Sequence, residues 1–247
     1  METLPFIKMH GLGNDYVYVD CFQPDTASRL AHIDLPALAR AVSDRHRGIG
    51  SDGLVLIMPS DKADLKMRMF NADGSEGRMC GNAARCIAKY AFESGLCGQK
   101  MTLETLAGIK KLTVNPQSGL ITVEMGTTIG NPHKVFITDE PVETLAIYGL
   151  EDTNVEWINV LNRREIAMRV WERGSGETMA CGTGACAAAT EAMNQGLTEN
   201  EVTVHLRGGD LLVRRDENGI IYLTGPATEV FRGEYPLIHY PANPICK

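Results

Sequence analysis

The fold of this chain is decided by the stretch CGNAARCIAKYAFESG, residues 80–95. The residues from Ala83 onward are largely apolar, and the run stops at Gly95, the residue type that most often follows the end of a helix. A helix that is apolar around most of its circumference belongs in a protein interior. We therefore predict a buried central helix over residues 83–95, with Cys80 just before it.

The same pattern occurs a second time, 101 positions further along the chain. Twelve identities relate residues 67–108 to the second copy, where chance would give roughly three. The helix reappears over residues 183–195, and Cys181 takes the place of Cys80. Two alanine-rich helices can also resemble each other by composition, but the matched residues outside the helices need a separate explanation. The repeat predicts two similar halves, each with strands wrapped around one central helix, that meet at one cleft.

Short apolar runs broken by Gly, Pro and Asp precede the first helix and predict β-strands. These runs are residues 6–9, 16–19, 54–58 and 65–70. Residues 35–45, entered through Asp34 and Pro36, predict a further helix. We expect the first half to span residues 1–127 and the second 128–247, with the extreme C-terminal strand free to return to the first half.

The charge of the chain argues against a nucleic-acid partner. The formal net charge is -7, and no long run of Lys or Arg provides the basic patch that binds phosphates. The first residues lack the features of a signal peptide, and no apolar stretch approaches the roughly 18 residues of a membrane span. We expect a cytoplasmic protein that acts on a small molecule, without a membrane partner.

The chain has seven cysteines, an odd number, and no Cys-x-x-Cys pair. This count favours free thiols over a disulfide framework and gives no zinc motif. A single cysteine is usually a buried core residue, and we expect Cys86 and Cys186, inside the helices, to pack in this way. Cys80 and Cys181 differ because both precede a helix at the same point of the repeat.

A pair of thiols at two helix N-termini suits proton exchange at a carbon atom. The first N–H groups of a helix have no partner within the helix, so they can bind a carboxylate, and we expect them to lower the pKa of a nearby thiol. Inverting a stereocentre beside a carboxylate needs a base on one face and an acid on the other. We predict that Cys80 and Cys181 supply these two groups in an amino-acid racemase or epimerase that needs no cofactor.

The residues around Cys80 resemble the signature of the diaminopimelate epimerase family, Asn-x-Asp-Gly-Ser, four residues, then Cys-Gly-Asn-Gly/Ala-x-Arg, which stands without a mismatch at residues 71–85. The resemblance extends through residues 8–16, 44–53, 130–133, 153–156 and 171–186. One departure is the connection after Gly126. The family carries some tens of residues there, and this chain has only residues 127–129 before Gly130.

The resemblance implies an α/β fold of the α+β type, with two pseudo-symmetric halves that each curl a mostly antiparallel sheet around a central helix. It also implies interconversion of LL- and meso-diaminopimelate, in lysine and peptidoglycan biosynthesis, without pyridoxal phosphate or metal. A homodimer is left open. By motif, the substrate-binding residues are Asn14, Asn71, Gly81, Asn82, Asn131, Asn154, Glu172, Arg173, Gly182 and Thr183, and His133 and Glu172 lie beside the reacting carbon.

Each assignment has a structural alternative. Asn14 and Asn71 lie in loops where asparagine often only caps a turn. His133 can be a hydrogen-bonded loop histidine, and Glu172 with Arg173 a solvated pair at the end of a strand. Two other functions also fit the cysteines, a racemase of the same fold for another amino acid and a thiol redox or metal-binding module. Two thiols in one cleft would in addition be open to reversible oxidation to a disulfide.

Overall fold

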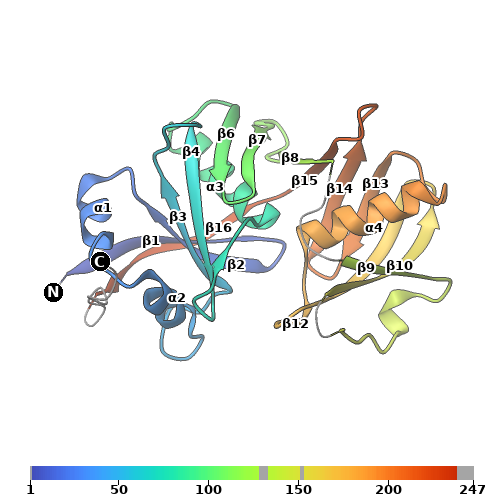
Figure 1. Ribbon diagram of the computed structural model, residues 1–247, viewed down its shortest axis with the longest axis horizontal. Helices are drawn as coiled ribbons and strands as arrows, with labels where there is room; N and C mark the ends of the chain where they lie inside the picture. Colours follow the sequence, from blue (N-terminus) through green and yellow to red (C-terminus); the bar gives the residue numbers. More distant parts are fainter. Residues whose placement is uncertain (1, 128–132, 151–152, 238–247) are drawn as a thin grey trace.

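The computed structural model describes residues 2–127, 133–150 and 153–237 of the chain. Figure 1 shows two lobes side by side, each with strands curved around one long helix, α3 or α4. The first lobe contains β1 (Thr3–Gly11), β2 (Asn14–Asp20), α1 (Pro24–Leu30), α2 (Leu35–Ser43), β3 (Gly53–Met58), β4 (Leu65–Asn71), β5 (Glu76–Gly77), α3 (Gly81–Glu93), β6 (Lys100–Thr105), β7 (Gly108–Val114) and β8 (Ile121–Gly126).

The second lobe repeats the order of strands and central helix that runs from β2 to β8, without counterparts of β1, α1 and α2. It contains β9 (His133–Thr138), a short 3₁₀ helix η1 (Val142–Thr144), β10 (Asn154–Asn162), β11 (Glu165–Glu172), β12 (Gly176–Thr178), α4 (Gly182–Asn194), β13 (Glu201–Leu206), β14 (Gly209–Arg215) and β15 (Ile221–Gly225). The last described strand, β16 (Thr228–Pro236), crosses back and pairs with β1. The resulting mixed fold has a large, mostly antiparallel sheet and few helices.

One continuous sheet runs through both lobes. Its strand order is β16-β1-β2-β3-β4-β6-β7-β8-β15-β14-β13-β11-β10-β9. The two short strands outside this order, β5 and β12, pair with β4 and β11 respectively. The lobes join where β8 pairs antiparallel with β15, for example at Val123 and Leu223. This pairing and the return of β16 connect the two lobes through backbone hydrogen bonds, so the relative position of the two central helices is set by the sheet.

The sequence repeat appears in the structure as a repeat of elements and of register. Helices α3 and α4 each have 13 residues and begin at Gly81 and Gly182, which are 101 positions apart. The parallel pair Leu65 and Leu103 in the first lobe has its counterpart in Ile166 and Val204 in the second. Strands outside the alanine-rich helices therefore share the repeat, which excludes helix composition as its cause.

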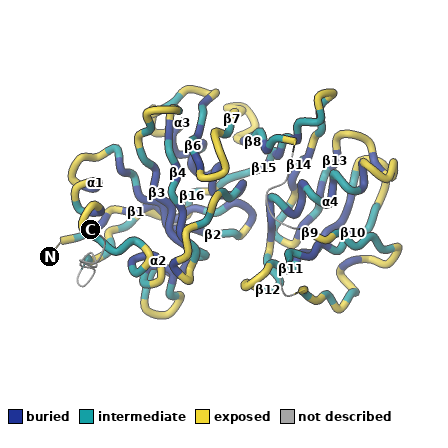
Figure 2. The backbone as a smooth tube through the Cα atoms, in the orientation of Figure 1, coloured by how far each residue is buried: buried dark blue, intermediate teal, exposed yellow. Residues whose placement is uncertain are grey.

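The two central helices are buried. Figure 2 shows dark blue and teal along α3, α4 and most strands around them, with exposed residues in the loops and on β7 and β16. Cys86 and Cys186 are fully buried and belong to one apolar cluster that includes residues of both lobes. Both helices are followed by a glycine with positive φ, Gly95 at 76° and Gly196 at 70°, as expected for a residue that ends a helix in the left-handed conformation.

The predicted local elements differ little from the observed ones. The expected strands lie within β1 to β4. The side chain of Asp34 caps the N-terminus of α2, and this helix ends at Ser43, two residues before the predicted end. Helix α1 was not predicted, because its residues carry no apolar periodicity strong enough to indicate a helix. The expected division at residues 127 and 128 adjoins a segment outside the described residues.

Candidate active site

Cys80 and Cys181 occupy the same structural position in the two lobes. Each is the residue immediately before its helix, with extended backbone, so its side chain lies beside the N–H groups of the first helical turn. Both line one cavity of about 400 Å³. The repeat therefore brings the two thiols to a single site, with a helix N-terminus behind each of them.

The N-termini of α3 and α4 approach each other closely at this site. A Cβ atom at Gly182 would lie 3.8 Å from Cα of Gly81 and 3.0 Å from a methyl group of Leu223. A side chain at position 182 would therefore press on Leu223 and fill the space up to the opposing helix. The N–H groups at the starts of both helices have no partner within their helices, so a carboxylate between them would receive donors from both lobes.

The predicted residues that line this cavity, in addition to the two cysteines, are Asn14, Asn71, Gly81, Asn82, Glu172, Arg173, Gly182 and Thr183. Asn131 lies outside the described residues. His133 and Asn154 are described but are not among the lining residues. Asn154 instead accepts a hydrogen bond from the backbone N–H of Arg173 at 2.9 Å, which fixes the backbone from which the Arg173 side chain extends.

The expected lowering of the thiol pKa values is wrong for this structure. Burial raises the pKa of Cys80, and backbone N–H groups of Ala83 and Asn82 offset only part of this. Burial, together with the charge of Glu172, raises the pKa of Cys181 well above its ordinary value. The N–H groups at the helix N-termini lower both pKa values as predicted, but the loss of water around the half-buried Cys80 and the buried Cys181 outweighs their effect.

The two loop asparagines, Asn14 and Asn71, make hydrogen bonds within the protein and also line the cavity. Asn71 donates from Nδ2 to Oγ of Ser75 at 2.9 Å, so it closes its loop as the structural alternative expects. Asn14 donates to a carboxylate oxygen of Asp52 at 2.8 Å. In both residues the amide nitrogen donates to a protein group. The amide oxygen of Asn71 is thus left to meet a hydrogen-bond donor in the cavity, whereas that of Asn14 already accepts from Asn82 and lies 3.5 Å from the Cys80 sulfur.

Glu172 lies next to Cys181. Burial raises the pKa of Glu172, and hydrogen bonds from the hydroxyl of Thr178, at 2.5 Å, and from the thiol of Cys181 oppose this. Below the start of α4 lies a second carboxylate, Glu156, which is fully buried and hydrogen-bonded to Nδ1 of His133 at 2.7 Å. The second thiol therefore has two carboxylates in its vicinity.

Three residues that support predicted site residues from outside the cavity lining were not predicted as functional: Asp52, Arg85 and Glu156. Asp52 and Arg85 hold asparagine side chains of the cavity, and Glu156 holds His133. All three lie inside the sequence stretches that match the family motifs. Their role could not be predicted from the sequence, because a residue that orients another side chain has no recognisable spacing of its own. Among the described residues, no group of three His, Cys, Asp or Glu side chains could hold a metal ion.

Comparison with known sequences gives one consistent result. The diaminopimelate epimerase family model matches the chain twice, over residues 6–130 and 127–230, in agreement with the repeat. The diaminopimelate epimerases of Acetivibrio thermocellus and Moorella thermoacetica are each 44% identical over 281 aligned positions, covering 94% of this chain and 98% and 99% of theirs. The alignments are longer than the 247 residues of this chain, so the relatives contain residues without a counterpart here.

More distant proteins share the fold. A phenazine biosynthesis protein of the PhzF family from Bacillus anthracis superposes with a TM-score of 0.69 at 17% identity, covering 96% of this chain and 100% of that one. A hydroxyproline epimerase from Agrobacterium vitis gives a TM-score of 0.66 at 13% identity, covering 95% and 93%. At such low identities these matches describe the architecture alone.

Proposed function

The chain belongs to the diaminopimelate epimerase family, and on that premise we propose that it inverts one α-carbon of diaminopimelate by passing protons between Cys80 and Cys181. The enzyme is an isomerase that acts on a small molecule. The observation that carries the mechanism is the pair of thiols, each before an equivalent helix, on one cavity of about 400 Å³.

In the proposed reaction one cysteine, as thiolate, removes the α-proton from one face of the carbon. The other cysteine, as thiol, gives its proton to the opposite face, so the pair ends with its protonation states exchanged. The negative charge that develops towards the α-carboxylate is stabilised by the N–H groups of Gly81, Asn82, Gly182 and Thr183. No additional oxidant, reductant or cofactor is needed for this proton balance.

The raised pKa values mean that both thiols hold their protons in the unliganded protein at neutral pH. We infer that substrate binding creates the thiolate, because the substrate ammonium group places a positive charge beside the α-carbon and hence near both sulfurs. Glu172, which accepts a hydrogen bond from the Cys181 thiol, is placed to receive the proton on that side.

The distal end of the substrate also carries an amino and a carboxylate group. We propose that the amide oxygen of Asn71 accepts from the distal ammonium and that Arg173 binds the distal carboxylate through its planar pair of donors. Asn14, whose amide oxygen lies 3.5 Å from the Cys80 sulfur, is proposed to bind the substrate nearer the reacting carbon. Asn131 and Asn154 complete the proposed set, and His133 remains a proposed neighbour of the reacting carbon. A racemase for another amino acid would keep the thiols and change these distal contacts.

The cellular setting is also a proposal. No helix of the described residues is long and apolar enough to cross a membrane. The described cysteines are all free, which supports the reducing cytoplasm as the place of action. We further propose the division into residues 1–127 and 128–247, to which the observed pairing of β16 with β1 is the exception. Size-exclusion chromatography with light scattering will decide between a monomer and a homodimer.

The decisive experiment incubates the protein with LL-diaminopimelate in heavy water. The expected product is meso-diaminopimelate with deuterium at the inverted carbon. Cys80→Ala and Cys181→Ala should each lower kcat by about 10²–10⁴-fold, the usual contribution of a general acid or base. Cys186→Ala, which removes a buried thiol outside the cavity, is the control. Full activity of either cavity variant contradicts the mechanism, and exchange with another amino acid alone contradicts the substrate.

A further inference from the structure

Four side chains form an unbroken line of hydrogen bonds beside Cys80. Nη2 of Arg85 donates to Oδ1 of Asn82 at 2.7 Å, Nδ2 of Asn82 donates to Oδ1 of Asn14 at 3.2 Å, and Nδ2 of Asn14 donates to Oδ2 of Asp52 at 2.8 Å. The Cys80 sulfur lies 3.5 Å from the same oxygen of Asn14. The line joins α3, β2 and the residue before β3.

The chemistry of the two end residues determines the direction of every bond in this line. A carboxylate only accepts, so Asp52 must face the NH₂ group of Asn14, and a guanidinium only donates, so Arg85 must face the oxygen of Asn82. An isolated amide can turn over at little cost, but neither of these amides can turn without placing two donors or two acceptors against each other. The oxygen of Asn14 is therefore held towards Cys80.

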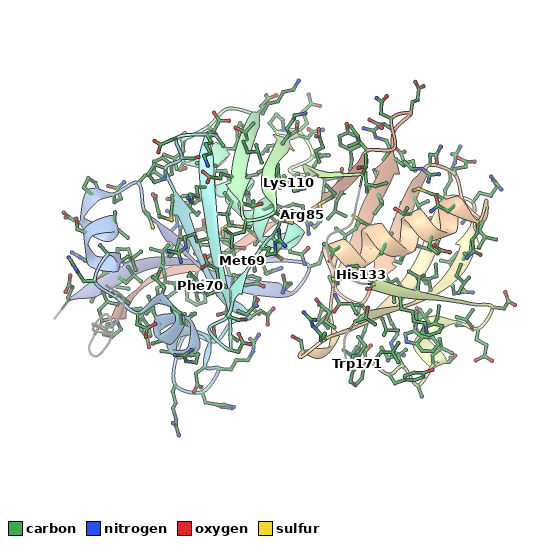
Figure 3. All side chains as sticks on the ribbon, in the orientation of Figure 1. Met69, Phe70, Arg85, Lys110, His133 and Trp171 are labelled. Atoms are coloured by element: carbon green, nitrogen blue, oxygen red, sulfur yellow. The ribbon has the colours of Figure 1, made fainter. Side chains whose placement is uncertain are left out.

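Both ends of the line are themselves fixed. Arg85 is fully buried, and Figure 3 places it on the side of the first lobe that faces the second. Its Nε donates to the carbonyl of Pro226 at 3.1 Å. Asp52 accepts from the backbone N–H of Asp15 at 3.0 Å and pairs with Arg45 at 3.0 Å. These contacts leave neither end residue free to rotate.

The second thiol has no equivalent of this arrangement. At the repeat-related positions, Asn82 is replaced by Thr183 and Arg85 by Cys186. The Cys181 sulfur lies 3.4 Å from the Thr183 hydroxyl, which can donate or accept, and it accepts the N–H of Gly184 at 3.4 Å. The Cys181 thiol instead has the carboxylate of Glu172 as its acceptor, so only at Cys80 is the acceptor an amide oxygen whose orientation depends on neighbouring side chains.

We propose that Asp52 and Arg85 are positioning residues that act from the two ends of this one-way line, and that they hold the Asn14 oxygen against Cys80 so that the proton stays on this thiol until substrate binds. An oxygen lone pair at this place favours S–H and disfavours a thiolate. This inference rests on the proposed role of Cys80, and it makes the two cysteines chemically unequal although the repeat places them alike.

The test measures the rate of alkylation of each cysteine by iodoacetamide across pH, with peptide mass spectrometry to separate the sites. The pH midpoint reports ionisation, whereas the plateau rate reports access. The variant Asp52→Asn has an amide in place of the carboxylate, and this amide can donate, so the Asn14 amide becomes free to turn its NH₂ group to the sulfur. We expect the Cys80 midpoint to fall by about one pH unit while the Cys181 midpoint stays in place.

The matched control is Asp15→Asn. Asp15 lies in the same ion cluster, where it pairs with Arg45 and Lys8, but its side chain is not bonded to Asn14. The variant Asp15→Asn removes the same charge as Asp52→Asn without releasing the Asn14 amide. The pH midpoint of Cys80 should therefore move by less than about half the shift expected in Asp52→Asn. Other charged or titratable groups around Cys80 are Tyr16 and Tyr18 of β2, Arg85 and Cys86 of α3 and Glu172 of β11, and none is altered by either variant.

The proposal is overturned if the Cys80 midpoint is unchanged or rises in folded Asp52→Asn, or if Asp15→Asn lowers it equally. Should Asp52→Asn not fold, the unaltered protein provides the test by ¹⁵N NMR. The side-chain NH₂ resonance of Asn14 should titrate in the acidic range with Asp52, whereas titration with the Cys80 thiol would contradict the proposed direction. Neither measurement requires turnover, so its outcome is independent of the heavy-water experiment.

The Arg85 end is tested with two variants of different hydrogen-bonding capacity. Arg85→Lys retains a group that only donates, and Arg85→Gln introduces one that can also accept. Hydrogen exchange of the Asn82 side-chain amide should accelerate by about tenfold in Arg85→Gln and much less in Arg85→Lys, as expected for the loss of one oriented bond. Equal acceleration in both would show that Arg85 merely fills space.

Discussion

The side-chain amide of Asn82 donates a hydrogen bond to the backbone carbonyl of Ala180 at 3.4 Å, so the residue two positions after one cavity thiol is bonded to the residue just before the other. This bond crosses from the first lobe to the second. It links the loop that carries Cys181 to the start of the helix that follows Cys80. The separation of the two thiols therefore depends on a side chain as well as on the sheet.

We predict that Asn82→Ala lowers both activity and stability. The change leaves a donor of Arg85 and the carbonyl of Ala180 without this partner, and each stranded buried group costs about 1–3 kcal/mol. We expect kcat/KM to fall by at least about tenfold, because small shifts in the spacing of catalytic groups are costly. Urea unfolding and initial rates measure the two effects. Unchanged stability together with unchanged kcat/KM would refute the bridging role of Asn82.

A second prediction concerns Gly184, in the first turn of α4. A Cβ atom at this position would lie 2.6 Å from Oε1 of Glu156, well inside contact distance. Gly184→Ala should therefore destabilise the protein by about 1–3 kcal/mol, the range for an overpacked interior, and displace the Glu156 and His133 pair.

Gly98→Ala provides the control for Gly184→Ala. Nothing lies within 4 Å of a Cβ at position 98, and its backbone is not in the left-handed region, so the free energy of unfolding should change little. The free energy of unfolding from urea titration measures both variants. If Gly184→Ala is as stable as Gly98→Ala, the contact with Glu156 does not constrain this position.

The sequence allowed much of this architecture to be predicted, because a repeat doubles the evidence for each element. The alignment of residues 67–108 with their second copy predicted the two helices, the two cysteines before them and the glycines that follow them. The direction of the thiol pKa shifts was predicted wrongly, because a sequence shows a helix N-terminus but not how far water is excluded from Cys80 and Cys181. Contacts such as that between Arg85 and Asn82 depend on side-chain directions that spacing alone does not give.

A third prediction follows from the carboxylate beside Cys181. A negative charge disfavours a neighbouring thiolate, and after burial Glu172 is the largest cause of the raised pKa of Cys181. Glu172→Gln should lower the pH midpoint for alkylation of Cys181 and move that of Cys80 less. The same variant should reduce kcat by about 10²-fold or more if Glu172 exchanges a proton with Cys181 during turnover.

Glu177→Gln is the matched control for Glu172→Gln. Glu177 is bound by Arg169 at 2.7 Å and by Arg207 at 3.0 Å, and it is not among the residues that line the cavity. Its replacement should leave both alkylation midpoints in place. A Cys181 midpoint that stays the same in Glu172→Gln would show that burial alone sets the ionisation of this thiol.

The last prediction concerns stability at alkaline pH. Burial raises the pKa of Cys186 to about 12, whereas a thiol in the unfolded chain has an ordinary value near 9.0. Between these values the unfolded state releases a proton that the folded state keeps, so the folded state binds more protons and the free energy of unfolding falls as pH rises. Each such thiol contributes a slope of roughly 1 kcal/mol per pH unit.

Cys186→Ala isolates this contribution. The variant should lose about 1 kcal/mol at pH 7 through the missing sulfur, yet its free energy of unfolding should fall less steeply than that of the unaltered protein between about pH 9 and 11. Cys97→Ala, which removes a thiol at a half-buried position, should change the slope less. Urea unfolding at several pH values gives these slopes directly. Parallel curves for Cys186→Ala and the unaltered protein would mean that the Cys186 thiol ionises equally in both states, and hence that water reaches it in the folded protein.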